Sequence, residues 1–125
     1  MLQSSPGQSF DYSECFEAVK QTFTRFPNVR VIRGIVPNTL PNVDSETIAY
    51  LSIDMNCAEP EIAAAEFFWD KLSAGGVMLL DDYCYSEEFI LQNEAFNEFA
   101  SRRNIQVLAL PTGQVLIFKP CARQS

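Results

Sequence analysis

Aspartates stand at the ends of two apolar runs in this 125-residue chain. Asp54 follows the run Thr47–Ile53, and the pair Asp81-Asp82 follows the run Val77–Leu80. In α/β proteins, ligands bind beyond the carboxyl ends of parallel strands, and neighbouring strands lie ~4.8 Å apart. If the two runs are paired strands, Asp54 and Asp81 project into a common space. Asp82 joins them where the chain leaves its strand.

Three carboxylates in one crevice repel each other unless a positive charge neutralises them. The neighbouring sequence offers no Arg or Lys for this role, whereas Mg²⁺ prefers carboxylate and water oxygens. Such a cation could chelate a sugar diol and lower the pKa of one hydroxyl, with Asp54 as the general base. The alternative is structural, because an aspartate after a buried strand often serves only as a turn residue or helix N-cap. Spacing alone leaves both interpretations open.

The composition excludes several other kinds of chemistry. The chain has no histidine, which rules out a Ser-His or Cys-His nucleophile pair and a histidine-bound zinc. Its four cysteines are scattered, without the short spacing of a zinc knuckle or redox motif. A net charge of −7 disfavours nucleic acid, and no apolar stretch reaches membrane-spanning length. With no secretory signal in the sequence, we expect a cytoplasmic protein with neither nucleic-acid nor membrane partners.

Five apolar or β-branched runs predict strands. The second of them is almost unbroken, as in a strand that is buried on both faces. The last two are separated by a Pro-Thr-Gly-Gln turn, which predicts an antiparallel hairpin. The predicted strands are Val29–Arg33, Thr47–Ile53, Val77–Leu80, Ile105–Leu110 and Val115–Lys119.

Three segments with apolar residues at helical spacing predict helices. The first begins at Asp11 or Ser13. The second begins near Pro60 and is closed by Gly75-Gly76, and the third is capped by Ser86. Their core-facing residues are expected to be Phe16, Val19, Phe23 and Phe26, then Ile62, Ala65, Trp69 and Leu72, then Phe89, Phe96 and Phe99.

The order of these segments predicts an α/β fold. We expect a flexible leader over residues 1–10 and a single α/β domain over residues 11–125. The sheet should have about five strands, mostly parallel, and should end in the antiparallel hairpin.

Several blocks of the sequence, in the same order, resemble the macrocin O-methyltransferase-like family, class I methyltransferases that act on sugar hydroxyls. The resemblance covers Asn28 to Pro120 and is more specific than one short motif. The blocks are VIRGIVPNTLP from Val31, LSIDMN from Leu51, FFWDKL from Phe67 with Gly75-Gly76, Asp81-Asp82-Tyr83, and LPTGQ from Leu110. The resemblance implies a Rossmann-like fold, S-adenosylmethionine as the methyl donor, Mg²⁺ bound by Asp54, Asp81 and Asp82, and Asp54 as the base.

The glycine-rich turn and acidic strand end that hold the cofactor in this family have no match before Gly34. We therefore expect a truncated Rossmann-like methyltransferase fold that is not active alone. S-adenosylmethionine would bind only if a partner chain completes the site. Because an open apolar edge attracts another chain, we expect a homodimer or a partner chain that covers the exposed sheet edge, and a sugar hydroxyl as the small-molecule ligand. The alternatives are a non-catalytic interaction or small-ligand-binding module and one half of a split methyltransferase.

Overall fold

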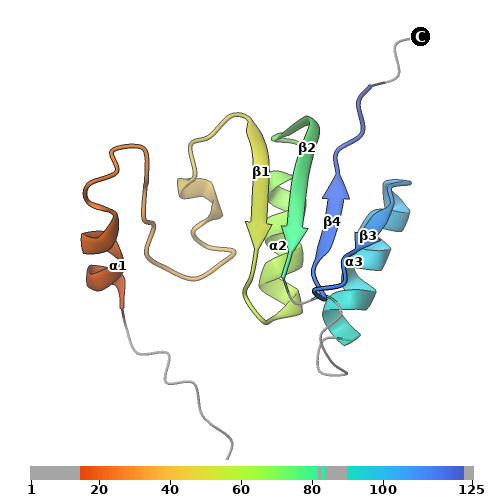
Figure 1. The fold of residues 1–125 in the computed structure, drawn as a ribbon, viewed down its shortest axis with the longest axis horizontal. Coiled ribbons are helices and arrows are strands. Elements are labelled where there is room, and N and C mark those ends of the chain that lie inside the picture. The colour runs from red at the N-terminus through yellow and green to blue at the C-terminus, as the bar shows by residue number, and fades with distance from the viewer. Residues whose placement is uncertain (1–14, 82, 84–89, 123–125) are drawn as a thin grey trace, which may run out of the picture. The chain divides into compact units, whose positions relative to one another are not determined.

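The computed structural model describes residues 15–81, 83 and 90–122, coloured from red to blue along the chain in Figure 1. Its contacts divide the chain into two units, Met1–Arg33 and Gly34–Ser125. The described part of the first unit holds one helix, α1 (Phe16–Phe23), of which no residue is buried. Within this unit, the cations of Lys20 and Arg33 lie 5.9 and 5.5 Å from the centre of the Phe16 ring. The helix predicted to reach Phe26 therefore ends three residues earlier.

The segment Val29–Arg33, predicted as a strand, forms no strand in the structure. β-branched residues favour a strand only when a neighbouring strand pairs with them and buries one face. None of these five residues is buried, and the described residues supply no such neighbour. The prediction of this strand was wrong.

The second unit is built on a four-stranded sheet with the order β1-β2-β4-β3. β1 and β2 are parallel, whereas β4 is antiparallel to both of its neighbours, β2 and β3. The predicted α/β class and the closing hairpin are confirmed. The sheet is mixed and has four strands, in place of the mostly parallel sheet of about five that was expected. The strands are β1 (Ile48–Ile53), β2 (Leu72–Leu80), β3 (Val107–Ala109) and β4 (Val115–Phe118).

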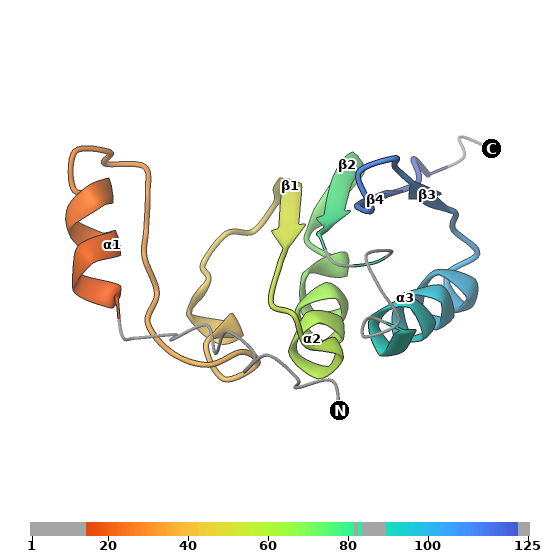
Figure 2. The same ribbon diagram turned by 60° about the horizontal axis from the view of Figure 1, so that its bottom comes forward.

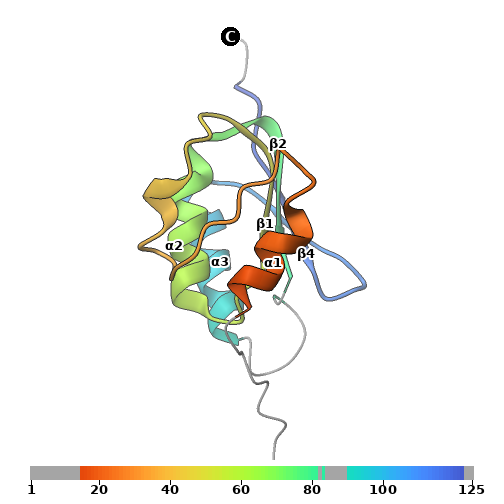
Figure 3. The ribbon, with the colours of Figure 1, turned by 90° about the vertical axis from the view of Figure 1, so that its left-hand side faces the viewer.

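Two helices of this unit, α2 (Ala58–Trp69) and α3 (Ile90–Arg102), pack on the same side of the sheet (Figures 2 and 3). The rings of Trp69 and Phe99 meet edge to face at 5.3 Å in the core beneath them. The predicted core residues Ala65, Trp69, Leu72, Phe96 and Phe99 are buried, and Ile62 is half-buried. Ser86 and Phe89, assigned to the start of the last helix, lie outside the described residues.

The second helix ends at Trp69, with Asp70 as its C-cap, so Gly75-Gly76 does not close it as predicted. Both glycines lie inside β2, at an irregularity where Ile48 pairs with Leu72 but Tyr50 pairs with Val77. Gly75 has a φ of +77°, which glycine adopts far more readily than other residues. The glycines therefore mark an irregularity within a strand, where β2 has three more residues than β1 between the paired positions.

The strand β1 lies at an edge of the four-stranded sheet, and only one of its faces is buried because α2 and α3 both pack on the same side of the sheet. Ile53 is in the core, whereas Tyr50 is 59% exposed. The expectation that this strand is buried on both faces was wrong, because an unbroken apolar run does not show whether both faces are covered.

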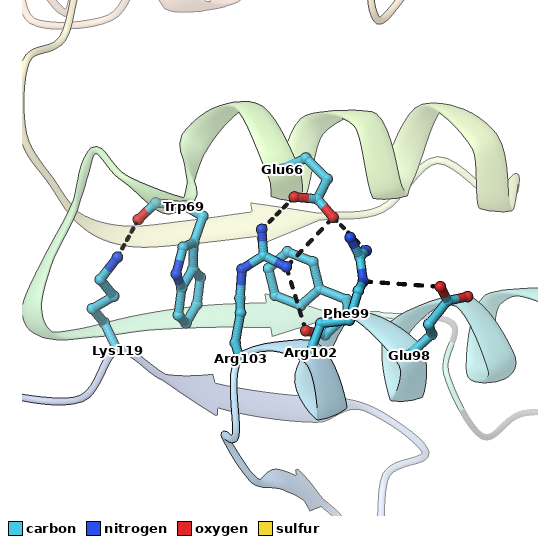
Figure 4. Close-up of polar contacts among 7 residues, drawn as sticks. All are labelled: Glu66, Trp69, Glu98, Phe99, Arg102, Arg103 and Lys119. Atoms are coloured by element: carbon cyan, nitrogen blue, oxygen red, sulfur yellow. Dashed lines mark hydrogen bonds and ion pairs between the residues drawn. The ribbon is translucent and has the colours of Figure 1, made fainter.

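Charged side chains join α2 to α3 on the outside of the helix pair (Figure 4). Glu66 accepts a hydrogen bond of 2.6 Å from Arg102 Nη2, and Glu66 Oε2 also pairs with Arg103. The Arg103 guanidinium lies 3.9 Å from the centre of the Phe99 ring. Burial raises the pKa of Glu66, but the hydrogen bonds and positive charges of the two arginines lower it by more, so the pKa lies below its usual value.

Candidate functional site

The parallel register of β1 and β2 brings two of the predicted site residues to the same end of the sheet, where both strands have their carboxyl ends. Ile53 pairs with Leu80, and the backbone N–H of Asp81 donates to the carbonyl oxygen of Ile53 at 3.1 Å. Asp54 and Asp81 therefore follow directly on paired residues, where the arrowheads of β1 and β2 lie side by side in Figure 1. Asp54 is exposed and Asp81 is half-buried, while Asp82 lies outside the described residues.

The Asp81 carboxylate is held by the β3–β4 hairpin, which lies on the other side of β2 from β1. Gln114 Nε2 donates a hydrogen bond of 2.6 Å to Asp81 Oδ1. The Gln114 amide is fixed in turn by Thr112, whose hydroxyl donates to Gln114 Oε1 at 3.0 Å. The turn is closed by the N–H of Leu110, which donates to the carbonyl of Gln114 at 2.9 Å. This chain of contacts fixes one oxygen of Asp81, and no side-chain hydrogen bond or ion pair among the described residues engages the other.

The loop after β1 is fixed by an acid in the first turn of α2. Glu61 is only 3% exposed, and its Oε1 accepts a hydrogen bond of 3.1 Å from the backbone N–H of Met55. The next residue, Asn56, has a φ of +54°, in the left-handed region that asparagine tolerates. Glu61 thus sets the path of the chain immediately after Asp54.

Tyr83, the last residue of the Asp81-Asp82-Tyr83 block, is a buried anchor of the same region. Its hydroxyl donates to Asn97 Oδ1 on α3, and Asn97 Nδ2 donates to Asn93 Oδ1 at 2.7 Å. Tyr83 therefore attaches the chain that leaves β2 to the covering helix.

The described residues contain no group of three or more His, Cys, Asp or Glu side chains that could hold a metal ion. Two of the three predicted ligands, Asp54 and Asp81, do lie at the same end of the sheet, and both offer hard carboxylate oxygens. Mg²⁺ commonly binds proteins through one or two carboxylates and keeps several waters. The residues at this end of the sheet therefore fit such a cation, and the metal set that includes Asp82 stays a prediction.

Two residues that shape the site, Gln114 and Glu61, were not singled out as functional from the sequence. Gln114 is 33 residues away from Asp81, and only the pairing of β2 with β4 brings them together. Glu61 lies in the first turn of α2, where an acid suits the helix dipole. A buried acid that reaches back to the preceding loop resembles a capping box, which places its Glu at the third helical position, whereas Glu61 is at the fourth.

A family model described as Macrocin-O-methyltransferase (TylF) matches residues 10–110 of this chain. No curated protein matches the sequence. Within the described residues, no helix is long and apolar enough to span a membrane.

Solved structures that share the fold include those of three methyltransferases. The O-methyltransferase NovP has a TM-score of 0.69 at 20% identity, with 84% of this chain and 45% of NovP covered. CalS11, a TDP-rhamnose 3'-O-methyltransferase of calicheamicin biosynthesis, has a TM-score of 0.56 at 19% identity over 70% of this chain and 40% of its own. PaMTH1, a methyltransferase of Podospora anserina with bound SAH, has a TM-score of 0.59 at 18% identity over 85% of this chain and 55% of its own. The chain thus spans about half the length of these proteins.

Proposed function

This chain belongs to the macrocin-O-methyltransferase family, and on that premise we propose that the end of the sheet carrying Asp54 and Asp81 binds the metal ion and the sugar acceptor of an O-methyltransferase site. The observation that carries the proposal is the parallel register, which sets both acids beyond the carboxyl ends of adjacent strands. The acceptor class rests on the family description and on CalS11, which methylates a TDP-linked rhamnose.

In the proposed reaction, Asp54 takes the proton of the sugar hydroxyl that is methylated. It is the exposed acid of the pair, so a substrate can reach its carboxylate without displacing the core. Asp81, which is held by Gln114, would offer its second oxygen to a Mg²⁺ ion, together with the other two proposed ligands, Asp54 and Asp82. When bound, Mg²⁺ would lower the pKa of the coordinated hydroxyl.

We further propose that the residues of this sequence do not bind S-adenosylmethionine by themselves, and that residues outside it complete the cofactor site. PaMTH1 has the same fold and holds SAH. This chain covers only 55% of the PaMTH1 chain. In this sequence, no glycine-rich turn of the kind that opens a nucleotide site precedes Gly34.

Calorimetric titration of the purified chain tests the two parts of the proposal separately. We expect Mg²⁺ to bind and to raise the melting temperature, and Asp81→Asn to abolish both effects. The matched control is Asp70→Asn, because Asp70 is exposed at the end of α2 and precedes the start of β2, whereas Asp81 follows the end of that strand. If the Asp81→Asn protein still shows the Mg²⁺-linked rise in melting temperature, these aspartates serve only as turn residues.

S-adenosylmethionine is titrated in the same way, with and without Mg²⁺. We expect no heat of binding from the chain alone. Micromolar binding of S-adenosylmethionine by these residues alone would contradict the need for residues outside this sequence, while leaving the metal site standing.

A second candidate, a non-catalytic interaction module, is favoured by one observation. One face of the sheet carries exposed apolar side chains that neither helix of the second unit covers.

A further inference from the structure

The sheet of the second unit has one face covered by helices and one that they leave uncovered. The registers place alternate residues of the strands on each face, and Ile53, Met78, Leu80, Val115 and Ile117 point to the helices. Figures 2 and 3 show α2 and α3 on that one side only. Strand positions that alternate with these form the uncovered face, which consists of Tyr50, Ser52, Val77, Leu79, Leu108, Leu116 and Phe118.

Six of the seven residues of the uncovered face are apolar or aromatic, and none is charged, although 20% of the chain is charged. Tyr50, Leu108 and Phe118 are 59%, 52% and 48% exposed. Larger apolar patches of this kind usually mark interaction sites in folded proteins, and charged residues are depleted at the centre of protein interfaces. The face therefore has the composition of an interface.

A groove of about 350 Å³ continues the uncovered face beside β3 and β4. Leu108 and Phe118 line both the groove and the face. The other lining residues are Asn104, Ile105, Gln106 and Pro120, so the groove is also without charge.

The size of the face decides what kind of partner it can bind. A fully covered aromatic side chain buries about 150–250 Å², so the exposed halves of Tyr50 and Phe118 offer roughly 200 Å² together. With Leu108, the half-buried residues and the groove, one copy offers on the order of 500 Å². Two such faces bury about 1,000 Å², the lower limit for a specific protein interface.

We propose that the uncovered face binds the same face of a second copy of this chain, forming a two-layer sheet packing. Twisted sheets pack face to face about 10 Å apart, with the side chains of their inner faces interdigitating. Tyr50, Val77 and Phe118 lie in one row across β1, β2 and β4. A two-fold axis along β2 would therefore place Tyr50 of each copy opposite Phe118 of the other.

This assembly goes beyond the proposed methyl transfer and does not depend on it. The second copy covers a face of the sheet, whereas Asp54 and Asp81 stand at the strand ends. The proposed metal site therefore stays accessible in the dimer.

Sedimentation equilibrium of the purified chain between about 1 and 200 µM tests the proposal. We expect a reversible monomer–dimer equilibrium with a dissociation constant on the order of 10 µM, as suits an interface near the lower size limit. Since each copy carries a net charge of −7, added salt should screen their repulsion and tighten the dimer.

Leu108→Glu and Leu108→Lys should each weaken association by at least about 100-fold, because either charge would be buried in the apolar contact. Using both signs separates burial from simple repulsion between acidic chains. The control is Leu91→Glu on α3, where Leu91 is 68% exposed and outside the uncovered face, and it should leave the equilibrium unchanged. Circular dichroism confirms that the variants remain folded.

A single monomeric species up to about 200 µM would overturn the proposal and assign the face to another occupant. A dimer that responds equally to Leu108→Glu and Leu91→Glu would also overturn it, because association would then use another surface.

Discussion

Replacing Gln114 by leucine removes the hydrogen bond that holds the Asp81 carboxylate at the end of β2. A hydrogen bond to a charged group contributes about 1.5–3 kcal/mol to stability when it is shielded from water. Asp81 is half-buried, so water can replace part of the lost contact. We therefore expect Gln114→Leu to lower the free energy of unfolding by about 1 kcal/mol.

Urea denaturation at pH 7 measures this loss, and a double-mutant cycle with Asp81→Ala isolates the pair. We expect a coupling energy of about 1 kcal/mol between the two positions. Gln21→Leu is a suitable control, because Gln21 is exposed on α1 and makes no side-chain hydrogen bond among the described contacts.

The same variant tests whether the contact serves the proposed metal site. Residues that hold a metal ligand typically contribute 10–100-fold to metal affinity, so Gln114→Leu should weaken Mg²⁺ binding by about that factor. A coupling energy near zero would refute the structural contact itself. Coupling without any change in Mg²⁺ affinity would retain the contact and refute its link to the metal.

Three further predictions concern the residues that hold the site and its helices. Glu66→Gln should lower the free energy of unfolding by about 1 kcal/mol at pH 7. Because the pKa of Glu66 is lower in the folded than in the unfolded chain, its ion pairs stabilise the fold above the unfolded pKa, and this stabilisation is lost as the pH falls through the folded pKa. The difference in stability between Glu66→Gln and the native chain should therefore shrink below about pH 4, as measured by melting temperatures at decreasing pH. Glu61→Ala removes the acceptor for the backbone of the loop after β1 and should cost about 1–3 kcal/mol in urea denaturation, whereas Glu61→Gln, which keeps an acceptor oxygen, should cost less. Phe99→Ala, at a position that is 0% exposed, should cost about 3–5 kcal/mol by the same assay, and a loss near zero would contradict the packing of α3 on α2.

The position of the two strand-end aspartates could be predicted from the sequence because it depends on local patterns. Apolar runs that end in Asp54 and Asp81 are separated by a helical segment, and that order favours a parallel pair. The paired ends of β1 and β2 follow from this arrangement, and the register confirms that they are adjacent.

The contacts around those acids could not be predicted, because they depend on pairings between distant segments. The hydrogen bond from Gln114 to Asp81 exists only because β4 lies beside β2, between it and β3. The same limit explains the error at Val29–Arg33, where the composition suits a strand but no described strand pairs with it. At Gly75-Gly76, the dipeptide is compatible with either a helix stop or an irregularity within a strand, and the pairing of β2 with β1 selects the irregular strand.

The position of β4 in the sheet has a consequence for the synthesis of the protein. β4 is the last strand of the described chain, yet it pairs with β2, whose residues leave the ribosome more than thirty positions earlier. Until β4 has been synthesised, the backbone N–H and C=O groups on one side of Val77–Leu80 lack their strand partner. Such unpaired groups attract other extended chains. A nascent chain stalled after α3 should therefore aggregate more readily than the finished protein.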